Sequence, residues 1–126
     1  MGCQVLIVDD DTNIQKLLKE VLEFAQFEVQ AVNDGIEALA YLEHTRPALI
    51  LLDLMMPRMD GQTFVRELER RGLSSTMPVI VLTAHIYAQP QVERMGIDYF
   101  MHKPFHVNEL LQQVRTLLAK YRHIET

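Results

Sequence analysis

The run Ala48-Leu49-Ile50-Leu51-Leu52 places five aliphatic residues in a row, directly before Asp53. A strand with one face in water alternates apolar and polar side chains, whereas a strand buried on both faces does not. The run therefore predicts a central strand of a parallel sheet covered by helices on both sides. Asp53 then lies at the carboxyl end of this strand, the edge where open α/β sheets bind ligands. Alternatively, Asp53 only opens the turn that Pro57 and Asp60-Gly61 continue.

Other segments extend this α/β pattern along the chain. Four further apolar segments predict strands at residues 4–8, 27–32, 78–82 and 96–101. Apolar residues spaced three and four apart predict amphipathic helices at residues 14–25, 36–43, 64–71 and 107–121. Strands that alternate with helices predict a three-layer, doubly wound α/β fold with a five-stranded parallel sheet and right-handed crossovers.

The fourth helix of this pattern is the weak one. Between residues 85 and 95 the helical periodicity is poor, and Pro90 lies in the middle of the segment. Proline costs a helix interior about 3 kcal/mol. We therefore expect a fourth helix that is short or irregular, or that begins near Pro90.

Length and charge limit the classes of function. A chain of 126 residues fits one domain, which we expect to span residues 1–126. No apolar run approaches the ~18 residues of a membrane span, and no signal-peptide pattern begins the chain, so we expect a cytoplasmic protein without membrane contact. The net charge of -5 gives no general attraction to nucleic acid, and we expect no direct nucleic-acid binding by this segment.

Polar residues of several kinds follow the predicted strands at their carboxyl ends. Asp9 and Asp10 follow the first strand and Asp53 the third, while Thr83 ends the fourth and Lys103 follows the fifth. Carboxylates gathered at one edge repel each other and raise each other's pKa unless a cation is present. Their hard oxygen atoms suit Mg²⁺, which takes only a few protein ligands and keeps several waters.

Simpler roles are open for some of these residues. Asp11 or Thr12 is expected to cap the first helix, which leaves the two preceding acids unexplained. Lys103 could pair with Asp53, as buried cations usually do with an acid. The histidines form no pair with metal-ligand spacing, and we expect four of them to lie on the surface: His44, His102, His106 and His123.

Taken together, the motifs resemble the receiver domain of two-component response regulators over essentially the whole chain. The segments that carry the resemblance are Val8-Asp9-Asp10-Asp11, residues 52–61 (LDLMMPRMDG), Val81-Leu82-Thr83-Ala84 and His102-Lys103-Pro104-Phe105. The resemblance implies a flavodoxin-like fold with the strand order 2-1-3-4-5. It also implies that the Lys103-Pro104 bond is cis.

The resemblance assigns a phosphoacceptor and a metal site. Asp53 is the aspartate that takes a phosphoryl group from a phosphohistidine. Mg²⁺ is held by Asp10, Asp53 and the main-chain carbonyl of Met55, with Asp9 acting through a water molecule. A carboxylate nucleophile of this kind needs no activating base.

The resemblance also assigns the residues that respond to phosphorylation. Lys103 and the hydroxyl of Thr83 bind the phosphoryl oxygens, and Phe100 turns into the space that Thr83 vacates. This reshapes the face formed by the fourth helix, the fifth strand and the fifth helix. Phe100 could instead serve only as core packing. His85 resembles a position that tunes hydrolysis of the acyl phosphate.

The implied partners are a sensor histidine kinase or a phosphotransfer protein as donor, and an output domain or partner protein as receiver of the signal. A homodimer is a further possibility. The domain is expected to be a phosphoacceptor and not an enzyme, beyond promoting its own phosphorylation and dephosphorylation.

Three other functions compete with this interpretation. A Mg²⁺-dependent phosphohydrolase with an aspartyl phosphate needs a second acid where Met55 stands. A flavin-binding electron carrier needs a phosphate loop after the first strand, where Asp9 to Asp11 repel phosphate. A receiver-like module that binds partners without phosphorylation usually lacks some of the acids or the lysine, and all of them are present here.

Overall fold

Five parallel strands form the centre of the computed structural model, which describes residues 4–85, 87–97 and 99–125. The strands are β1 Gln4–Val8, β2 Glu28–Val32, β3 Leu49–Leu52, β4 Val79–Thr83 and β5 Tyr99–His102. The helices are α1 Thr12–Phe24, α2 Gly35–Leu42, α3 Gly61–Arg70, α4 Gln89–Arg94 and α5 Val107–Glu125. The strand order β2-β1-β3-β4-β5 confirms the predicted fold class and topology.

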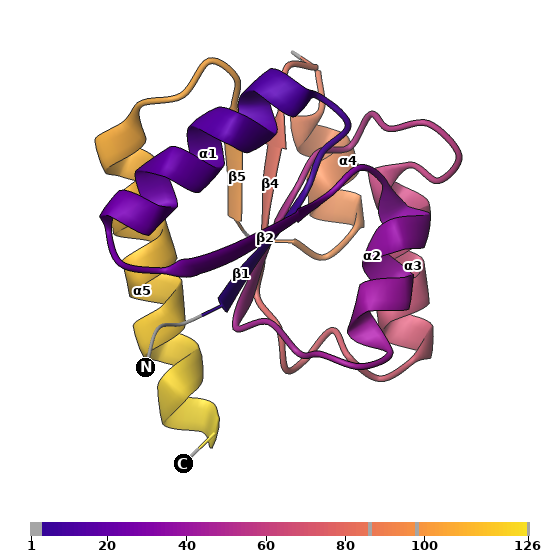
Figure 1. The fold of residues 1–126 in the computed structure, drawn as a ribbon. Coiled ribbons are helices and arrows are strands. Elements are labelled where there is room, and N and C mark those ends of the chain that lie inside the picture. The colour runs from indigo at the N-terminus through magenta and orange to yellow at the C-terminus, as the bar shows by residue number, and fades with distance from the viewer. Residues whose placement is uncertain (1–3, 86, 98, 126) are drawn as a thin grey trace.

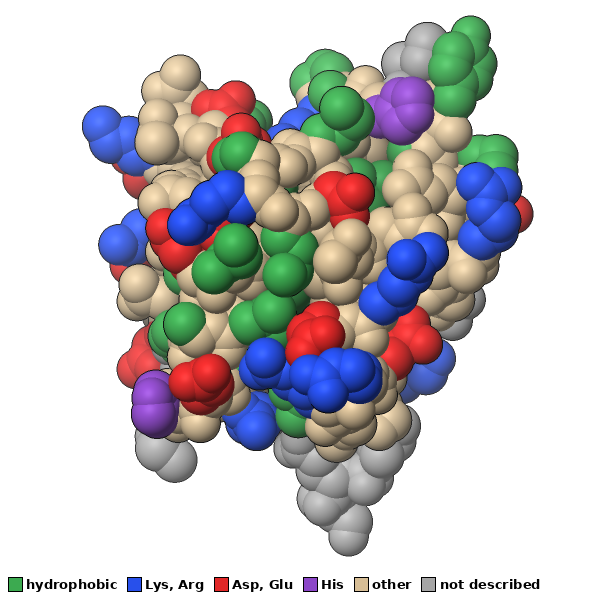
Figure 2. All heavy atoms as spheres, turned by 90° about the vertical axis from the view of Figure 1, so that its right-hand side faces the viewer, with side chains coloured by type: hydrophobic (Ala, Val, Ile, Leu, Met, Phe, Trp, Pro, Cys, Tyr) green, Lys and Arg blue, Asp and Glu red, His purple; other side chains and the backbone are tan. Residues whose placement is uncertain are grey.

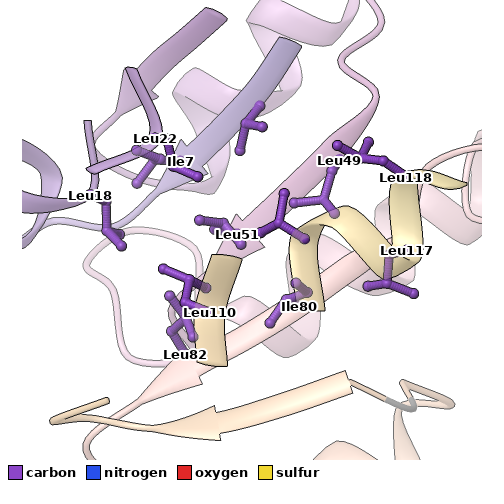
Figure 3. Close-up of a cluster of buried hydrophobic side chains, with 12 residues drawn as sticks. Ile7, Leu18, Leu22, Leu49, Leu51, Ile80, Leu82, Leu110, Leu117 and Leu118 are labelled. Carbon is purple, nitrogen blue, oxygen red and sulfur yellow. The ribbon is translucent and has the colours of Figure 1, made fainter. Parts of the chain in front are cut away.

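Helices cover both faces of the sheet, with α1 and α5 on one side and α2, α3 and α4 on the other (Figure 1). The side chains of β3 alternate between the two layers. Leu49 and Leu51 join a buried cluster with residues of α1 and α5 (Figure 3), whereas Ile50 and Leu52 pack with residues of α2 and α3. This two-sided burial explains why the central run contains no polar residue.

Figure 2 views the face that carries α2, α3 and α4. Hydrophobic side chains gather near its middle, and acidic and basic side chains surround them. None of the helices in the described part of the chain is long and apolar enough to span a bilayer.

Three helices begin at an aspartate whose side chain caps them. The carboxylates of Asp11, Asp34 and Asp60 accept hydrogen bonds from main-chain N–H groups in the first turns of α1, α2 and α3. Of the two candidates for the cap of the first helix, Asp11 and Thr12, the structure shows Asp11 in this role. Helix α4 differs, because the residue at its start, Ala88, offers no capping side chain and Pro90 occupies the first turn. Its six residues confirm the expected short fourth helix.

The predicted start of the fifth strand is wrong. The expected strand began at Gly96, but β5 begins at Tyr99. Gly96 has a φ of +75°, and the N–H of Ile97 donates to the carbonyl of Val92, so this segment closes the end of α4. A glycine in a left-handed conformation after a helix is typical of such an ending. Asp98 and the side chain of His123 lie outside the described residues.

Candidate functional site

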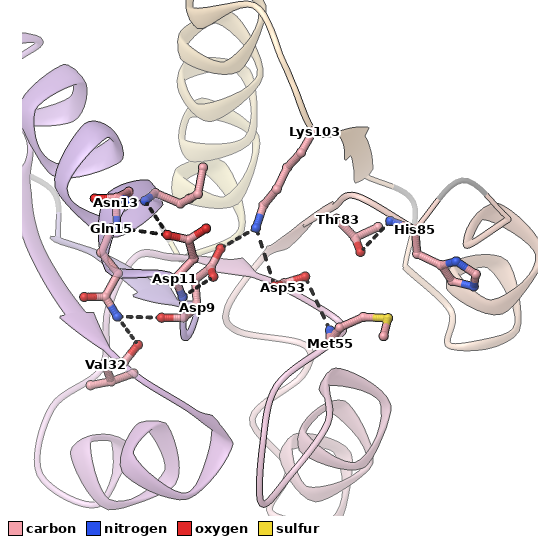
Figure 4. Close-up of polar contacts among 11 residues, drawn as sticks. Asp9, Asp11, Asn13, Gln15, Val32, Asp53, Met55, Thr83, His85 and Lys103 are labelled. Carbon is pink, nitrogen blue, oxygen red and sulfur yellow. Dashed lines mark hydrogen bonds and ion pairs between the residues drawn. The ribbon is translucent and has the colours of Figure 1, made fainter.

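The carboxyl ends of β1 and β3 bring two aspartates side by side. Val8 pairs with Leu52 in the register of these strands, and the N–H of Asp53 donates to the carbonyl of Val8 at 2.9 Å. Asp9 and Asp53 each follow the last residue of their strand, so they lie next to each other at the same edge of the sheet (Figure 4). This arrangement follows from the parallel register alone.

A third acid, Asp10, completes a cluster that fits a divalent cation. Asp9, Asp10 and Asp53 each offer a carboxylate oxygen, and these atoms lie within 4.8 Å of one another. Asp9 is 2% exposed and Asp53 7%, whereas Asp10 is open to solvent. Oxygen ligands with one side open to water are the donor set that Mg²⁺ prefers.

Lys103 supplies the positive charge of the described site. Its Nζ lies 2.7 Å from Oδ2 of Asp9 and 3.5 Å from Oδ2 of Asp53, so Asp9 is the closer partner (Figure 4). The expected Lys103–Asp53 pair is therefore the longer of two contacts. The Lys103-Pro104 peptide bond is cis, as the resemblance implied.

Burial and charge act differently on Asp53 and Lys103. Burial raises the pKa of Asp53, the charge of Asp9 raises it further, and Lys103 and the N–H of Met55 offset only part of this, so the net pKa is raised. Burial lowers the pKa of Lys103, but its bond to Asp9 and the charges of Asp9 and Asp53 raise it by more. Lys103 is therefore protonated and positively charged, while the positive charge near Asp53 does not fully offset its burial and the repulsion by Asp9. A bound cation would relieve this deficit.

Thr83 and Phe100 lie beyond the acids, on β4 and β5. Thr83 is fully buried, and its Oγ1 accepts a hydrogen bond from the N–H of His85 at 3.2 Å. Phe100 pairs with Val81 in the register and is partly buried against α4. Its ring lies edge-on to the ring of His102, with a centroid distance of 4.6 Å. The hydroxyl and the aromatic ring therefore belong to adjacent strands.

The histidine side chains that the structure describes lie on the surface. Their side chains are exposed at positions 44, 85, 102 and 106, which confirms the surface placement expected for His44, His102 and His106. The side chain of His85, two residues after Thr83, points away from Asp53 in Figure 4.

Sequence reasoning missed three residues around the site. The side-chain amide of Gln15 donates to the carbonyls of Asp9 and Val32, and so ties the end of β1 to the end of β2. Asp34 and Arg58 form an ion pair between the start of α2 and the loop after β3. Asn33-Asp34-Gly35 has the pattern of an ordinary turn before a helix, and Arg58 is one residue of the segment 52–61 that carries the resemblance, so neither indicates the ion pair between them.

Comparisons with known proteins agree with this geometry. Residues 5–115 match the family described as the response regulator receiver domain. The response regulator MprA of Mycobacterium tuberculosis is 38% identical over 122 residues, which cover 95% of this chain and 52% of that protein. The chain thus spans about half the length of the curated relatives it matches.

Solved structures show the same fold. A signal receiver domain of a signal transduction histidine kinase from Syntrophus aciditrophicus is 35% identical, with a TM-score of 0.86 and coverage of 94% of this chain and 92% of that one. A CheY-like receiver domain protein from Methanospirillum hungatei is 28% identical, with a TM-score of 0.88 and 98% of both chains covered.

Proposed function

The chain belongs to the family of response regulator receiver domains, which act in two-component signal transduction, and on this premise we propose that Asp53 is its phosphoacceptor. The observation that carries the proposal is a buried carboxylate at the end of the central strand, beside two further acids and one lysine. The donor is a phosphohistidine of a sensor histidine kinase or a phosphotransfer protein. As a receiver domain, the chain is a signalling domain rather than a classical enzyme.

The transfer replaces one bond to phosphorus with another. A lone pair of a carboxylate oxygen of Asp53 attacks phosphorus, and the phosphorus–nitrogen bond of the donor breaks, with its electron pair passing to the histidine. Such transfers depend on position and on neutralising the oxygen charges more than on covalent help. Lys103 is placed for this role, because its ammonium group lies 3.5 Å from Asp53 before any phosphoryl group arrives.

The acid cluster would hold Mg²⁺ through Asp10, Asp53 and the main-chain carbonyl of Met55, with Asp9 acting through water. When bound, the ion supplies positive charge next to the phosphoryl oxygens. Asp9 is held toward Lys103 at 2.7 Å, which suits a less direct part in metal binding.

Phosphorylation adds nearly two negative charges and three acceptor oxygens at Asp53. Lys103 can bind one oxygen, and the Thr83 hydroxyl can donate to another, since its hydrogen bond from the N–H of His85 uses the hydroxyl oxygen as acceptor and not the hydroxyl hydrogen. Movement of Thr83 would open space next to Phe100 on the adjacent strand. We propose that this shift changes the face formed by α4, β5 and α5, which an output domain, a partner protein or a second copy of the chain reads.

We further propose that residues 1–126 constitute one receiver domain and that it acts in the cytoplasm. The curated relatives are about twice as long as this chain, and we propose that, as in a response regulator, the receiver domain controls an output function.

The test is incubation with Mg²⁺ and acetyl phosphate followed by intact-mass measurement. The wild-type protein should gain the mass of one phosphoryl group, and Asp53→Asn should gain none. Asp60→Asn is the matched control, because the described contact of the Asp60 side chain is the cap of α3 and asparagine keeps the capping oxygen. Circular dichroism should show both variants folded. A phosphoryl gain in Asp53→Asn equal to that of the wild type would refute the assignment.

A further inference from the structure

The loop after Asp53 carries a strained turn at its tip. The N–H of Met59 donates to the carbonyl of Pro57 at 2.7 Å, and Arg58 between them has a φ of +66°. A hydrogen bond across three residues with a positive φ at the middle one is a rare and strained form of γ-turn. A residue other than glycine keeps such a conformation only where the surrounding structure holds it.

The side chain of Arg58 is held by Asp34 at the start of α2. Its Nε and Nη2 atoms lie 2.7 Å and 2.5 Å from Oδ2 of Asp34. Asp34 is only 3% exposed, and its Oδ1 accepts from the N–H of Glu37 at 2.9 Å. Burial raises the pKa of Asp34, but the hydrogen bonds from Glu37 and Arg58 lower it by more, so the net pKa is lowered and the carboxylate stays ionised.

The same loop is fixed at its base and lies close against α2. The N–H of Gly61 donates to the carbonyl of Leu54 at 2.9 Å. A side chain at Gly35, the first residue of α2, would meet Sδ of Met59 at 2.8 Å, so the glycine lets the loop lie directly on the helix. Residues 55–57 therefore lie between Leu54, which is bound to Gly61, and the turn at Arg58 and Met59, which lies on α2.

The backbone between these points touches the phosphoacceptor. The N–H of Met55 donates to Oδ1 of Asp53 at 3.3 Å. A change in the path of the loop would thus change both the carboxylate orientation and the position of the Met55 carbonyl. Arg58 itself is half exposed and contributes little to the core.

We propose that Arg58 is a positioning residue, which binds Asp34 and thereby holds the loop so that the main chain of Met55 and the carboxylate of Asp53 keep the geometry needed for a divalent cation. We call the Asp34–Arg58 ion pair the loop latch. The part of this inference that concerns the cation rests on the function proposed above, whereas the restraint of the loop does not.

The test compares variants that separate the latch from backbone strain. Arg58→Gly removes the side chain but keeps a residue that accepts a positive φ. Asp34→Asn keeps an oxygen that can cap α2 but removes the charge. Arg70→Ala is the matched control, because it removes the same charge from an Arg–Glu pair on α3. Thermal unfolding should show all variants folded at the measuring temperature.

Two readouts are needed. In the absence of metal, amide hydrogen exchange followed by NMR should be faster at Met55 and Met59 in Arg58→Gly and in Asp34→Asn, and unchanged in Arg70→Ala. In an NMR titration with Mg²⁺, the dissociation constant should rise about tenfold in both latch variants, as for other outer-shell partners of metal sites. The double variant should be no worse than Arg58→Gly alone, because Arg58→Gly already removes the ion pair with Asp34 together with the longer, 3.8 Å contact with Oε2 of Glu37.

The outcomes that would contradict the proposal separate three questions: whether the latch restrains the loop, whether Arg58 positions the site, and whether the site binds Mg²⁺. If the exchange of Met55 and Met59 in Arg58→Gly equals that in Arg70→Ala, the latch does not restrain the loop. If exchange accelerates but Mg²⁺ affinity is unchanged, Arg58 is not a positioning residue for the site. If the wild type binds no Mg²⁺, the proposed metal site is wrong, and the exchange rates still decide whether the latch restrains the loop.

Discussion

Asp9, Asp10 and Asp11 are neighbours in the sequence but have three different environments. Asp9 is buried and bound to Lys103, Asp10 is exposed at the edge of the acid cluster, and Asp11 caps α1. Asp11 uses its Oδ1 for the N–H groups of Asn13 and Ile14, which turns it toward the helix. Three identical side chains in a row therefore differ in burial and in their contacts.

This division predicts opposite effects for two alanine substitutions. Asp10→Ala should weaken Mg²⁺ binding strongly with little loss of stability, because the residue is exposed and is repelled by the nearby acids. Asp11→Ala should leave Mg²⁺ binding nearly unchanged but lower the free energy of unfolding by about 1 kcal/mol, the usual cost of a lost helix cap. Mg²⁺ titration and urea unfolding of both variants measure this. Equal Mg²⁺ affinities in the two variants would contradict the assignment.

The positions of the candidate site residues could be predicted because parallel strands end at one edge of the sheet. Asp53, Thr83 and Lys103 needed only the positions of the strand ends. Gln15 and Arg58 could not be found in this way, since their partners are main-chain or side-chain atoms on other elements. A sequence gives no direct sign of such a contact, which depends on how a helix and a loop are placed relative to each other.

Among the elements, the helices differ most in how they are stabilised. The caps of α1, α2 and α3 are local and follow from an aspartate before an apolar ladder, so these helices were predictable. Helix α4 has neither a side-chain cap nor strong periodicity, and its extent depends on packing of Val92 and Ala88 against Leu54 and Val81. The start of β5 was misjudged for a related reason, because Gly96 ends α4 and does not begin the strand.

The last turns of α3 contain a pH-dependent contact. Glu67 contacts Arg70 in the same helix and Arg71 directly after it, and the hydrogen bond from Arg70 is the largest cause that lowers the pKa of Glu67, to about 2. An acid whose pKa falls on folding adds stability above its ordinary pKa of 4.5, and this contribution is lost as the pH falls towards about 2.

We therefore expect Glu67→Gln to lower the melting temperature slightly at pH 7, because the contact is exposed and screened by solvent. The difference from the wild type should shrink as the pH falls below 4.5. Glu69→Gln is the control, since it removes an acid from the same turn of α3. A difference that stays constant between pH 7 and pH 3, or that is equal for the two variants, would mean that the Arg70 and Arg71 contacts do not stabilise the fold.

At the scale of the whole molecule, β4 and β5 connect the site with the face formed by α4, β5 and α5. Thr83 ends β4, and the N–H of Lys103 donates to its carbonyl at 2.9 Å. Two residues earlier in the register, Val81 pairs with Phe100, and both contact the cluster that holds α4. Thr83 and Phe100 therefore lie on adjacent strands between the acid cluster and α4, where the proposed response would have to pass.

We expect helix α4 to respond more readily than the other elements of that face. It has six residues, no side-chain cap, and one fully buried contact group around Val92 and Ala88. Ligands shift a population only as far as they bind one state better than the other, so a weakly held element needs a smaller difference. If Phe100 takes two positions, as proposed above, packing alone separates them, because its ring carries no hydroxyl.

We therefore expect residues 87–95 to be among the least protected amides in hydrogen exchange, well below Val79 to Leu82 in β4. Acetyl phosphate with Mg²⁺ should change the protection of this segment and of residues 100–105, because Thr83, Phe100 and Lys103 would all move or gain partners at once. Asp53→Asn treated in the same way is the control and should show no change. If residues 87–95 prove as protected as β4 and do not respond to acetyl phosphate in a wild-type protein that carries the phosphoryl group, then α4 is not part of the response. The signal would have to leave the site through another face, and the loop between Asp53 and α3 would be the next element to examine.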